Sequence, residues 1–374
     1  QEPKLYERDE LRKRQLTAGF SIEDLEVILH PMAEEGKEAI GSMGDDTPPA
    51  VLSRKYRPLS HFFRQNFSQV TNPPIDSLRE YRVMSLRTRF GNMGNVLAND
   101  SDQSEVYTLE SPVLTNGQFA KMIEHFGDTA YTIDCTMEVA ADGTLPENAL
   151  RDGLDRIRSE AEDAVRQGYE HLILSDEKVG PSKVPMPMIL VAGGVHSHLV
   201  GQGFRTYSSI NVRSAECMDT HYFAVLIGVG ATTVNPYLAL ESIGDRHARG
   251  LFEDQSLATC IDCFCEAIDL GLLKIMSKMG ISVISSYRGG YNFEALGLSR
   301  ALVAEFFPGM PSRISGIGLA GLQKKLVQTH KHAYGQDAAA LPIGGIYKYR
   351  RGGESHALEG QLIHMLQHAC DTDS

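Results

Sequence analysis

The sequence predicts an α/β fold with a mostly parallel sheet, open or barrel-like, and a helical arm at its N-terminus. Short β-branched runs alternate with longer amphipathic runs from about residue 105 onward. Capping residues and glycines separate these runs, as expected at helix ends. The chain has 374 residues, of which 42% are hydrophobic and 22% charged, so it can bury a substantial core.

The arm is expected to span residues 1–75. Ser21 and Asp24 have the spacing of a helix-capping box. The apolar face of that helix consists of Leu25, Ile28 and Leu29. The stretch 41–49, GSMGDDTPP, is predicted to be a loop because it is dense in residues that break regular structure. A further helix is expected to begin at Ser60 and must end before Pro73.

The alternating region is expected to form a central domain over residues 76–345, and a new unit begins at 346–374. Its predicted strands are 106–109, 130–133, 171–174, 188–192, 206–212, 231–234, 281–286 and 313–315. Its predicted helices are 146–167, 221–227, 324–331 and a long helix capped by Ser256 that ends at Gly280. Repeated alternation of strand and helix indicates a largely parallel sheet.

The stretch from Lys274 to Ser299 is predicted to be a helix–strand–loop–helix unit, with its last helix starting at Asn292. Ligands of α/β sheets usually meet the loops that follow the strands. The polar residues expected on this loop are Tyr287, Arg288, Tyr291 and Asn292.

Composition excludes several classes of protein. The net charge of −12 disfavours a broad nucleic-acid or anionic-membrane surface. No apolar run approaches the roughly 20 residues that a spanning helix needs, so we expect no membrane segment. Six cysteines in a chain of this length favour a reducing cytoplasm over a disulfide framework. The first residue is Gln1, which suggests a processed product or a piece of a longer polypeptide.

Three patterns resemble known sites but have simpler explanations. The cluster Cys260, Cys263 and Cys265 falls inside a predicted helix and lacks a second cysteine pair, so we favour helix cysteines over a metal site. The pairs His196/His198 and His330/His332 are interpreted as loop or surface histidines. The GxGxxG pattern at 316–321 lacks the acidic residue expected about 20 positions later in a dinucleotide site.

A polar group follows the predicted strand that ends at Val212. It comprises Arg213, Glu216, Asp219 and His221. A carboxylate and a histidine together can perform acid–base chemistry. They can equally form a buried ion-pair network that fixes a loop, and we favour that interpretation because no nucleophile or cofactor loop lies nearby in the sequence.

Several long strings together resemble the central domain of the large subunit of glutamate synthase, most closely the bacterial NADPH-dependent type. They are FFRQNFSQVTNPPIDSLRE, HYFAVLIGVGATTVNPYLALE, KIMSKMGISVISSYRGGYNFEALGL and RRGGESH. The resemblance covers nearly the whole chain. It departs from the family at His221-Tyr222, where many relatives carry two adjacent histidines, so a role for that pair does not carry over.

The resemblance implies a connecting domain built like a rudimentary TIM barrel. In the family, glutamine is hydrolysed in an N-terminal amidotransferase domain, ammonia passes through a tunnel, and a later FMN domain with a 3Fe-4S cluster makes glutamate from 2-oxoglutarate. FAD and NADPH belong to a small partner subunit. The resemblance therefore places no cofactor, metal or catalytic residue on this chain, and residues 346–374 would begin the FMN domain.

The tunnel wall is a separate expectation within this resemblance. Ammonia must stay neutral and away from bulk water, which calls for an apolar wall with a few carbonyls and hydroxyls. Met43 in the GSMGDD loop, and Thr71 and Asn72 in QVTNPP, offer that mixture. An ordinary packing loop between domains remains the alternative for these residues.

Two rival hypotheses remain. One is a free-standing α/β enzyme that binds an anionic ligand at the loops after Val212 and Ser286, with Arg213 and Arg288 as its contacts. The other is an interaction scaffold without a path for ammonia.

Overall fold

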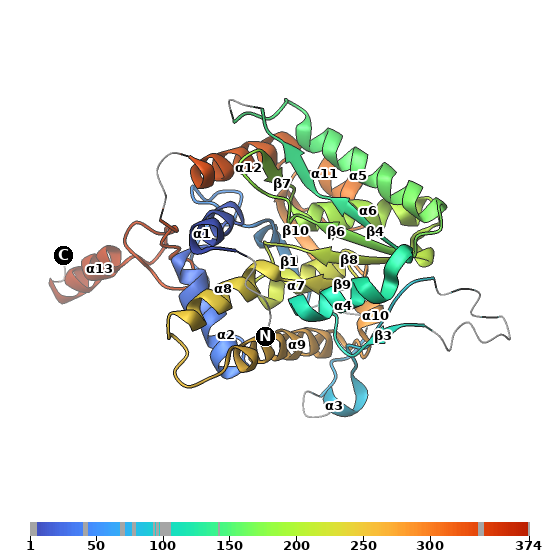
Figure 1. Cartoon of the computed structure of the whole chain (residues 1–374). Coiled ribbons are helices and arrows are strands. Elements are labelled where there is room, and N and C mark those ends of the chain that lie inside the picture. Colours follow the sequence, from blue (N-terminus) through green and yellow to red (C-terminus); the bar gives the residue numbers. More distant parts are fainter. Residues whose placement is uncertain are drawn as a thin grey trace.

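A computed structural model describes residues 6–39, 44–67, 72–76, 80–92, 94, 97, 106–140, 143–335 and 340–372. Four parallel strands form the central sheet, and helices surround them (Figure 1). The sheet order is β4 (Ala130–Asp134), β6 (His171–Ser175), β8 (Ser209–Arg213) and β9 (Thr233–Asn235). This confirms an α/β fold with a mostly parallel sheet. The alternation is also the one that a rudimentary barrel would use.

Helices connect the parallel strands. The connections are α5 (Ala149–Arg166) between β4 and β6, α6 (Met188–Gly201) between β6 and β8, and α7 (Thr220–Gly228) between β8 and β9. Helix α9 (Leu257–Met279) packs against α7 and against α8 (Tyr237–Ala248). The predicted caps are confirmed at both ends of α9, where the Ser256 side chain accepts from the backbone N–H of Thr259 and Gly280 adopts a left-handed conformation.

A second sheet joins distant parts of the chain. Its strands are β1 (Phe63–Gln65), β10 (Phe293–Leu298) and β11 (Ile314–Ile317), with β10 in the middle. Two short antiparallel ribbons pair β2 (Thr88–Arg89) with β3 (Thr108–Leu109), and β5 (Thr136–Glu138) with β7 (Lys183–Pro185). Outside the N-terminal arm, the other α-helices are α3 (Glu80–Val83), α4 (Asn116–Phe126), α10 (Ile284–Tyr287), α11 (Arg300–Phe306), α12 (Leu319–Tyr334) and α13 (Gly360–Thr372).

The N-terminal arm is helical, as predicted. It contains α1 (Arg8–Thr17), a π-helical segment η1 (Asp24–Leu29) and α2 (His30–Glu35). The Ser21–Asp24 capping box is confirmed: the Ser21 N–H donates to Asp24 Oδ2 at 2.7 Å, and the Asp24 N–H donates to Ser21 Oγ at 3.1 Å. Helix α1 packs on α8 and α12, and α2 packs on α9, so the arm lies against the body (Figure 1).

Four predictions of local structure are wrong. The predicted strand at 188–192 is the start of α6, and most of the predicted strand at 281–286 is coil and α10. The predicted helix from Asn292 is β10. The helix predicted from Ser60 is a 3-10 turn, η2 (Leu59–Phe62), followed by β1. Each error falls on a short apolar run, in which helical and strand periodicities cannot be distinguished.

No helix in the described parts of the chain is both long and apolar enough to cross a membrane.

Two glycines of α6 give a matched test of its packing. A Cβ on Gly193 would lie 2.4 Å from the Phe307 ring, whereas a Cβ on Gly201 would meet nothing within 4 Å. We expect Gly193→Ala to lower the free energy of unfolding by about 1–3 kcal/mol through overpacking. Gly201→Ala should leave it unchanged or raise it by up to about 1 kcal/mol. Urea denaturation measures both, and equal effects would contradict this packing.

Candidate functional site

A cavity of about 620 Å³ lies between the arm, the segment 53–61, the loop after β8, helix α12 and the segment 341–354. The loop after β8 marks the carboxyl end of the parallel strands, where α/β proteins usually bind ligands. Ionisable groups that line the cavity include Asp24, His61, Glu216, Lys325 and Glu354. Apolar residues such as Phe20, Ile28 and Ile343 complete the wall.

Burial biases several of these groups toward their uncharged forms. Desolvation raises the pKa of Asp24 to about 6 and that of Glu216 to about 7. Desolvation, together with the nearby Arg57 charge, lowers the pKa of His61 to about 3. Desolvation also lowers the pKa of Lys325. The cavity wall therefore carries less charge near neutral pH than its residue types suggest.

Glu216 lies in the loop after β8 with its carboxylate hydrogen-bonded to two neighbouring elements. Its Oε2 accepts hydrogen bonds from the Tyr222 hydroxyl at 2.6 Å and from the Met188 N–H at 2.9 Å. Asp219, in the same loop, caps α7 by accepting from the Tyr222 N–H at 2.9 Å. Glu216 thus ties the loop after β8 to the first turns of α6 and α7.

Arg213 lies at the end of β8 in an ion-pair network. Its guanidinium donates two 2.8 Å hydrogen bonds to the Glu177 carboxylate and one of 2.9 Å to Asn235 Oδ1. His221 extends elsewhere, with its Nε2 3.0 Å from the Ser60 carbonyl oxygen. Neither Arg213 nor His221 lines the cavity, whereas Glu216 and Asp219 do.

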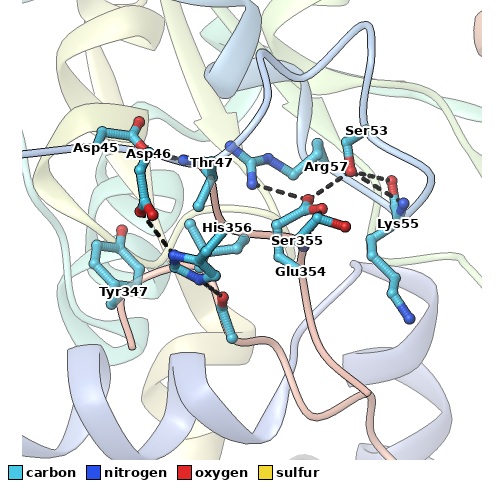
Figure 2. Close-up of polar contacts among 12 residues, drawn as sticks. Asp45, Asp46, Thr47, Ser53, Lys55, Arg57, Tyr347, Glu354, Ser355 and His356 are labelled. Carbon is cyan, nitrogen blue, oxygen red and sulfur yellow. Dashed lines mark hydrogen bonds and ion pairs between the residues drawn. The ribbon is translucent and has the colours of Figure 1, made fainter. Parts of the chain in front are cut away.

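A set of buried and part-buried polar contacts, which we call the clasp, joins the segment 344–358 to the N-terminal region. Glu354 Oε2 accepts from Arg57 at 3.1 Å and from the Ser53 hydroxyl at 2.5 Å (Figure 2). His356 Nδ1 lies 2.7 Å from Asp46 Oδ1, and hydrogen bonding to the Leu358 N–H and to His356 lowers the pKa of Asp46.

The carboxylate of Glu23 completes the clasp from the arm side. It accepts from the successive backbone N–H groups of Ile346, Tyr347 and Lys348 at 2.6, 3.2 and 3.0 Å. Neither Glu23 nor Glu354 was predicted from the sequence. Their partners lie roughly three hundred residues away along the chain, so the local pattern contained no signal for the pairing.

Tyr287 and Arg288 lie at the other end of α7. The Tyr287 hydroxyl donates to Gln65 Oε1 at 2.7 Å. The following loop attaches to the C-terminal end of α7 through Gly289 N to Ile227 O at 3.1 Å and Tyr291 N to Gly228 O at 3.2 Å. The loop after Val212, by contrast, leads into the start of α7. A single anion site shared by Arg213 and Arg288 is therefore not supported.

Two of the three tunnel candidates, Met43 and Thr71, lie outside the described residues. Asn72 is exposed and lies against Gly280 at the end of α9. The described part of the loop that follows Met43 includes Asp46, which contacts His356 in the clasp.

The remaining sequence patterns have structural explanations. Cys260 is buried and Cys263 and Cys265 are half-buried on α9, and none of the three forms a disulfide. The described residues contain no group of three or more side chains arranged to hold a metal ion. In the GxGxxG pattern, a Cβ on Gly316 would lie 2.1 Å from the Gly297 carbonyl oxygen, so close packing of β10 and β11 accounts for that glycine.

The histidine pairs do not lie on loops. His196 and His198 are half-buried on α6, with His198 2.7 Å from Glu162. His330 is buried on α12 with its Nε2 2.8 Å from the Gly180 carbonyl, and His332 is exposed on the same helix. The expectation of loop or surface histidines is wrong for His196 and His198, because α6 lies where a strand and loop were predicted. It is also wrong for His330, which faces the core from within a predicted helix.

The fold and the clasp define an α/β domain whose strand ends are attached to neighbouring segments of the same chain. Residues 13–299 match the family described as "Glutamate synthase central domain". The chain is 62% identical over its full length to the glutamate synthase [NADPH] large chain of Azospirillum brasilense and covers 24% of that protein. The chain belongs to the glutamate synthase central domain family.

Other relatives agree with this assignment. The chain is 39% identical to the glutamate synthase [NADPH] large chain of Bacillus subtilis and 37% identical to the ferredoxin-dependent glutamate synthase of Spinacia oleracea. These matches cover 96% and 98% of the chain, and each covers 23% of the relative. The chain thus spans about a quarter of the length of these relatives. A mutant flavocytochrome b2 with pyruvate bound aligns with 75% of this chain and 89% of its own, at 10% identity and a TM-score of 0.37.

The buried carboxyl of Glu216 predicts a pH-dependent stability. Its pKa is raised from 4.5 to about 7, so between these values the folded protein holds a proton that the unfolded chain has released. The free energy of unfolding should therefore fall as pH rises through this window. Glu216→Gln replaces the titrating carboxyl with an amide, so its free energy of unfolding should not fall through this window. The difference in free energy of unfolding between variant and wild type should therefore increase in favour of the variant by about 2 kcal/mol from about pH 5.5 to about pH 8, as measured by urea denaturation.

Glu253→Gln, at an exposed position, is the control and should follow the wild-type curve. If the free energy of unfolding of Glu216→Gln changed with pH in parallel with that of wild type, Glu216 would not be the group that holds the proton.

The clasp makes a separate prediction. Glu354→Gln removes the charge that balances the buried guanidinium of Arg57. We expect a loss of about 3 kcal/mol in the free energy of unfolding, because a buried charge is left without its partner. The control is Arg350→Gln, on the same segment as Glu354. It breaks a half-exposed 3.4 Å ion pair with Glu26 of the arm and should lower the free energy of unfolding by less than about 1 kcal/mol. Equal losses in urea denaturation would refute the energetic role of the Arg57–Glu354 pair.

Proposed function

We propose that this chain is the connecting segment of a glutamate synthase large chain, which converts glutamine, 2-oxoglutarate and NADPH into two molecules of glutamate. The observation that carries the proposal is the 62% identity to the Azospirillum brasilense large chain along the entire length. The complete enzyme is an oxidoreductase, and this chain contributes no complete active site of its own.

The proposed partners are the other parts of the same polypeptide. An amidotransferase domain would adjoin residues 1–75, the central α/β domain would span 76–345, and an FMN domain would begin within 346–374. FMN and the 3Fe-4S cluster would belong to that later domain, and FAD and NADPH to a small partner subunit. We place the enzyme in the cytoplasm.

The clasp supports a joining role for this chain. It binds the arm, on the proposed amidotransferase side, to the segment 344–358, on the proposed FMN side, through the carboxylates of Glu23 and Glu354. Charge-assisted hydrogen bonds of this kind fix geometry more narrowly than apolar contact does. Such a connection would hold two active sites at a constant separation.

The cavity supports an ammonia path at this junction. It lies where the arm and the C-terminal segment meet, and burial shifts the pKa values of Asp24, His61 and Glu216 toward the uncharged forms at neutral pH. Lower charge on this part of the wall suits neutral ammonia. Met43, Thr71 and Asn72 remain our candidates for other parts of the wall.

The proposal predicts uncoupling when the path is blocked. In the complete enzyme, Thr71→Phe should leave glutamine hydrolysis within about twofold of wild type but lower the glutamate formed from 2-oxoglutarate per glutamine hydrolysed. Thr206→Phe, the same change at an exposed threonine, is the control. Both rates are measured in one assay with glutamine and 2-oxoglutarate present, and unchanged coupling in Thr71→Phe would exclude Thr71 from the path.

A further inference from the structure

A cluster of basic and aromatic side chains lies at the C-terminal end of α7, at the opposite end of that helix from the loop after β8. It consists of His196 on α6, Arg205 in the turn before β8, and Arg288 and Tyr291 in the loop before β10. The rings of His196 and Tyr291 meet edge to face, with centroids 5.9 Å apart. Three separate parts of the chain thus bring two guanidinium groups into one region.

The two arginines differ in how they are bonded. Each guanidinium nitrogen of Arg205 donates one hydrogen bond: to His196 Nδ1 at 3.0 Å, to the Ser208 carbonyl at 2.6 Å and to the Gly230 carbonyl at 2.9 Å. Arg288 has one long contact, 3.4 Å from its Nη2 to Thr88 Oγ1. Its Nε is buried and has no hydrogen-bond partner among the described residues. Arg205 therefore has a structural role that Arg288 does not share.

A second buried polar group in the loop also lacks a partner. The Tyr291 hydroxyl is buried without a hydrogen bond in the described structure. Tyr291 has a φ of +47°, the only positive φ of a non-glycine residue in the described chain. Such a conformation is costly, and it persists only where the surroundings enforce it, often at binding sites.

The charge of this cluster is unbalanced. Neither Arg205 nor Arg288 has a carboxylate within 4.0 Å among the described residues. Burial lowers the pKa of each to about 10, and burial with the fields of both arginines lowers the pKa of His196 to about 3. The imidazole is thus neutral, and two desolvated positive charges remain.

Other buried arginines of this chain are compensated differently. Carboxylates lie 3.1 Å from Arg57, 2.9 Å from Arg158 and 2.8 Å from Arg213. A buried charge is costly unless it is paired, so these contacts are the arrangement expected of a structural arginine. Arg57 and Arg158 also have an unpartnered Nε, so what distinguishes Arg288 from these three is that no carboxylate lies beside its free donor among the described residues.

We propose that Arg288 and Tyr291 bind a small anion bearing one carboxylate or phosphate group, with Arg205 supplying additional positive field. The Arg288 guanidinium donates to the anion, the Tyr291 hydroxyl donates a further hydrogen bond, and the bound charge offsets the two buried cations. This site is distinct from the cavity and does not depend on the proposed ammonia path.

The test is protection of Arg288 from phenylglyoxal in the complete polypeptide that carries this chain. The rate at which each arginine is modified is followed by peptide mass spectrometry at constant ionic strength, with inorganic phosphate, acetate or chloride as the anion. We expect saturating phosphate or acetate to slow modification of Arg288 by about fivefold or more relative to chloride. Arg89, exposed on β2, is the internal control and should be unaffected.

The pattern of protection identifies the ligand chemistry. Protection by phosphate alone supports a phosphoryl ligand, and protection by both anions supports a site open to carboxylates. Equal rates in all three salts would overturn the proposal. An Arg288 that resists modification even in chloride would also overturn it, because the guanidinium would then already be covered by another part of the polypeptide.

Tyr291→Phe separates binding from simple accessibility. It keeps the ring against His196 and removes only the hydroxyl. We expect the phosphate concentration that gives half-maximal protection of Arg288 to rise by about tenfold, the effect of losing one hydrogen bond to a charged group. An unchanged concentration would overturn the assignment of both free donors to one anion.

Discussion

The buried carboxylate of Asp176 organises the carboxyl end of the parallel sheet. It follows β6 directly and accepts hydrogen bonds from the Ala215 N–H at 3.0 Å, the Tyr237 hydroxyl at 2.9 Å and the Ser214 hydroxyl at 3.2 Å. Burial raises its pKa to about 6, while these bonds oppose the rise. One carboxylate thereby connects the loops after β6 and β8 to the first turn of α8.

The arm is attached to this same end of the sheet. Arg14 on α1 donates to the carbonyl oxygens of Glu177 and Val179, each at 2.9 Å, and the Glu177 carboxylate pairs with Arg213. Protein groups therefore occupy the strand ends that most α/β proteins leave open for ligands. Once the arm is fixed here, Glu23 and the rest of the clasp can hold the C-terminal segment against it, so the proposed joining role depends on this network.

The sequence predicts well those elements whose patterns are long or that carry explicit ends. Helices α5 and α9 follow their apolar periodicity, and Ser21 and Ser256 cap as their spacing indicates. The start of α6 was mistaken for a strand because Met188 to Ala192 is apolar on every face and fully buried, which leaves no periodicity to interpret. Strand β10 exists because β1, more than two hundred residues earlier, pairs with it, and local preference cannot anticipate that partner.

In the candidate sites, too, local sequence indicates the residues that follow a strand but not the contacts that tertiary packing creates. Arg213, Glu216 and Asp219 could be found because they follow a recognisable strand. The loop of Arg288 is also singled out by the sequence, although β10 rather than a helix follows it. The proposed anion site in this loop also uses the charge of Arg205. The sequence around Arg205 shows no recognisable motif, and its contact with His196 is made only by tertiary packing. Local sequence did not indicate which arginines would acquire a carboxylate partner.

The two ends of α7 differ in whether a nearby arginine has a carboxylate partner. Near its start, Arg213 is buried beside Glu177, and the carboxyls of Glu216 and Asp219 are satisfied by neighbouring donors. At its C-terminal end, Arg288 is buried with neither a carboxylate within 4.0 Å nor a partner for its Nε among the described residues. Arg57, Arg158 and Arg213 each lie beside a carboxylate, whereas Arg205 and Arg288 do not in the described part of the chain. Of these last two, only Arg288 has an Nε without a partner among the described residues. This is the arrangement expected where the compensating charge comes from a ligand.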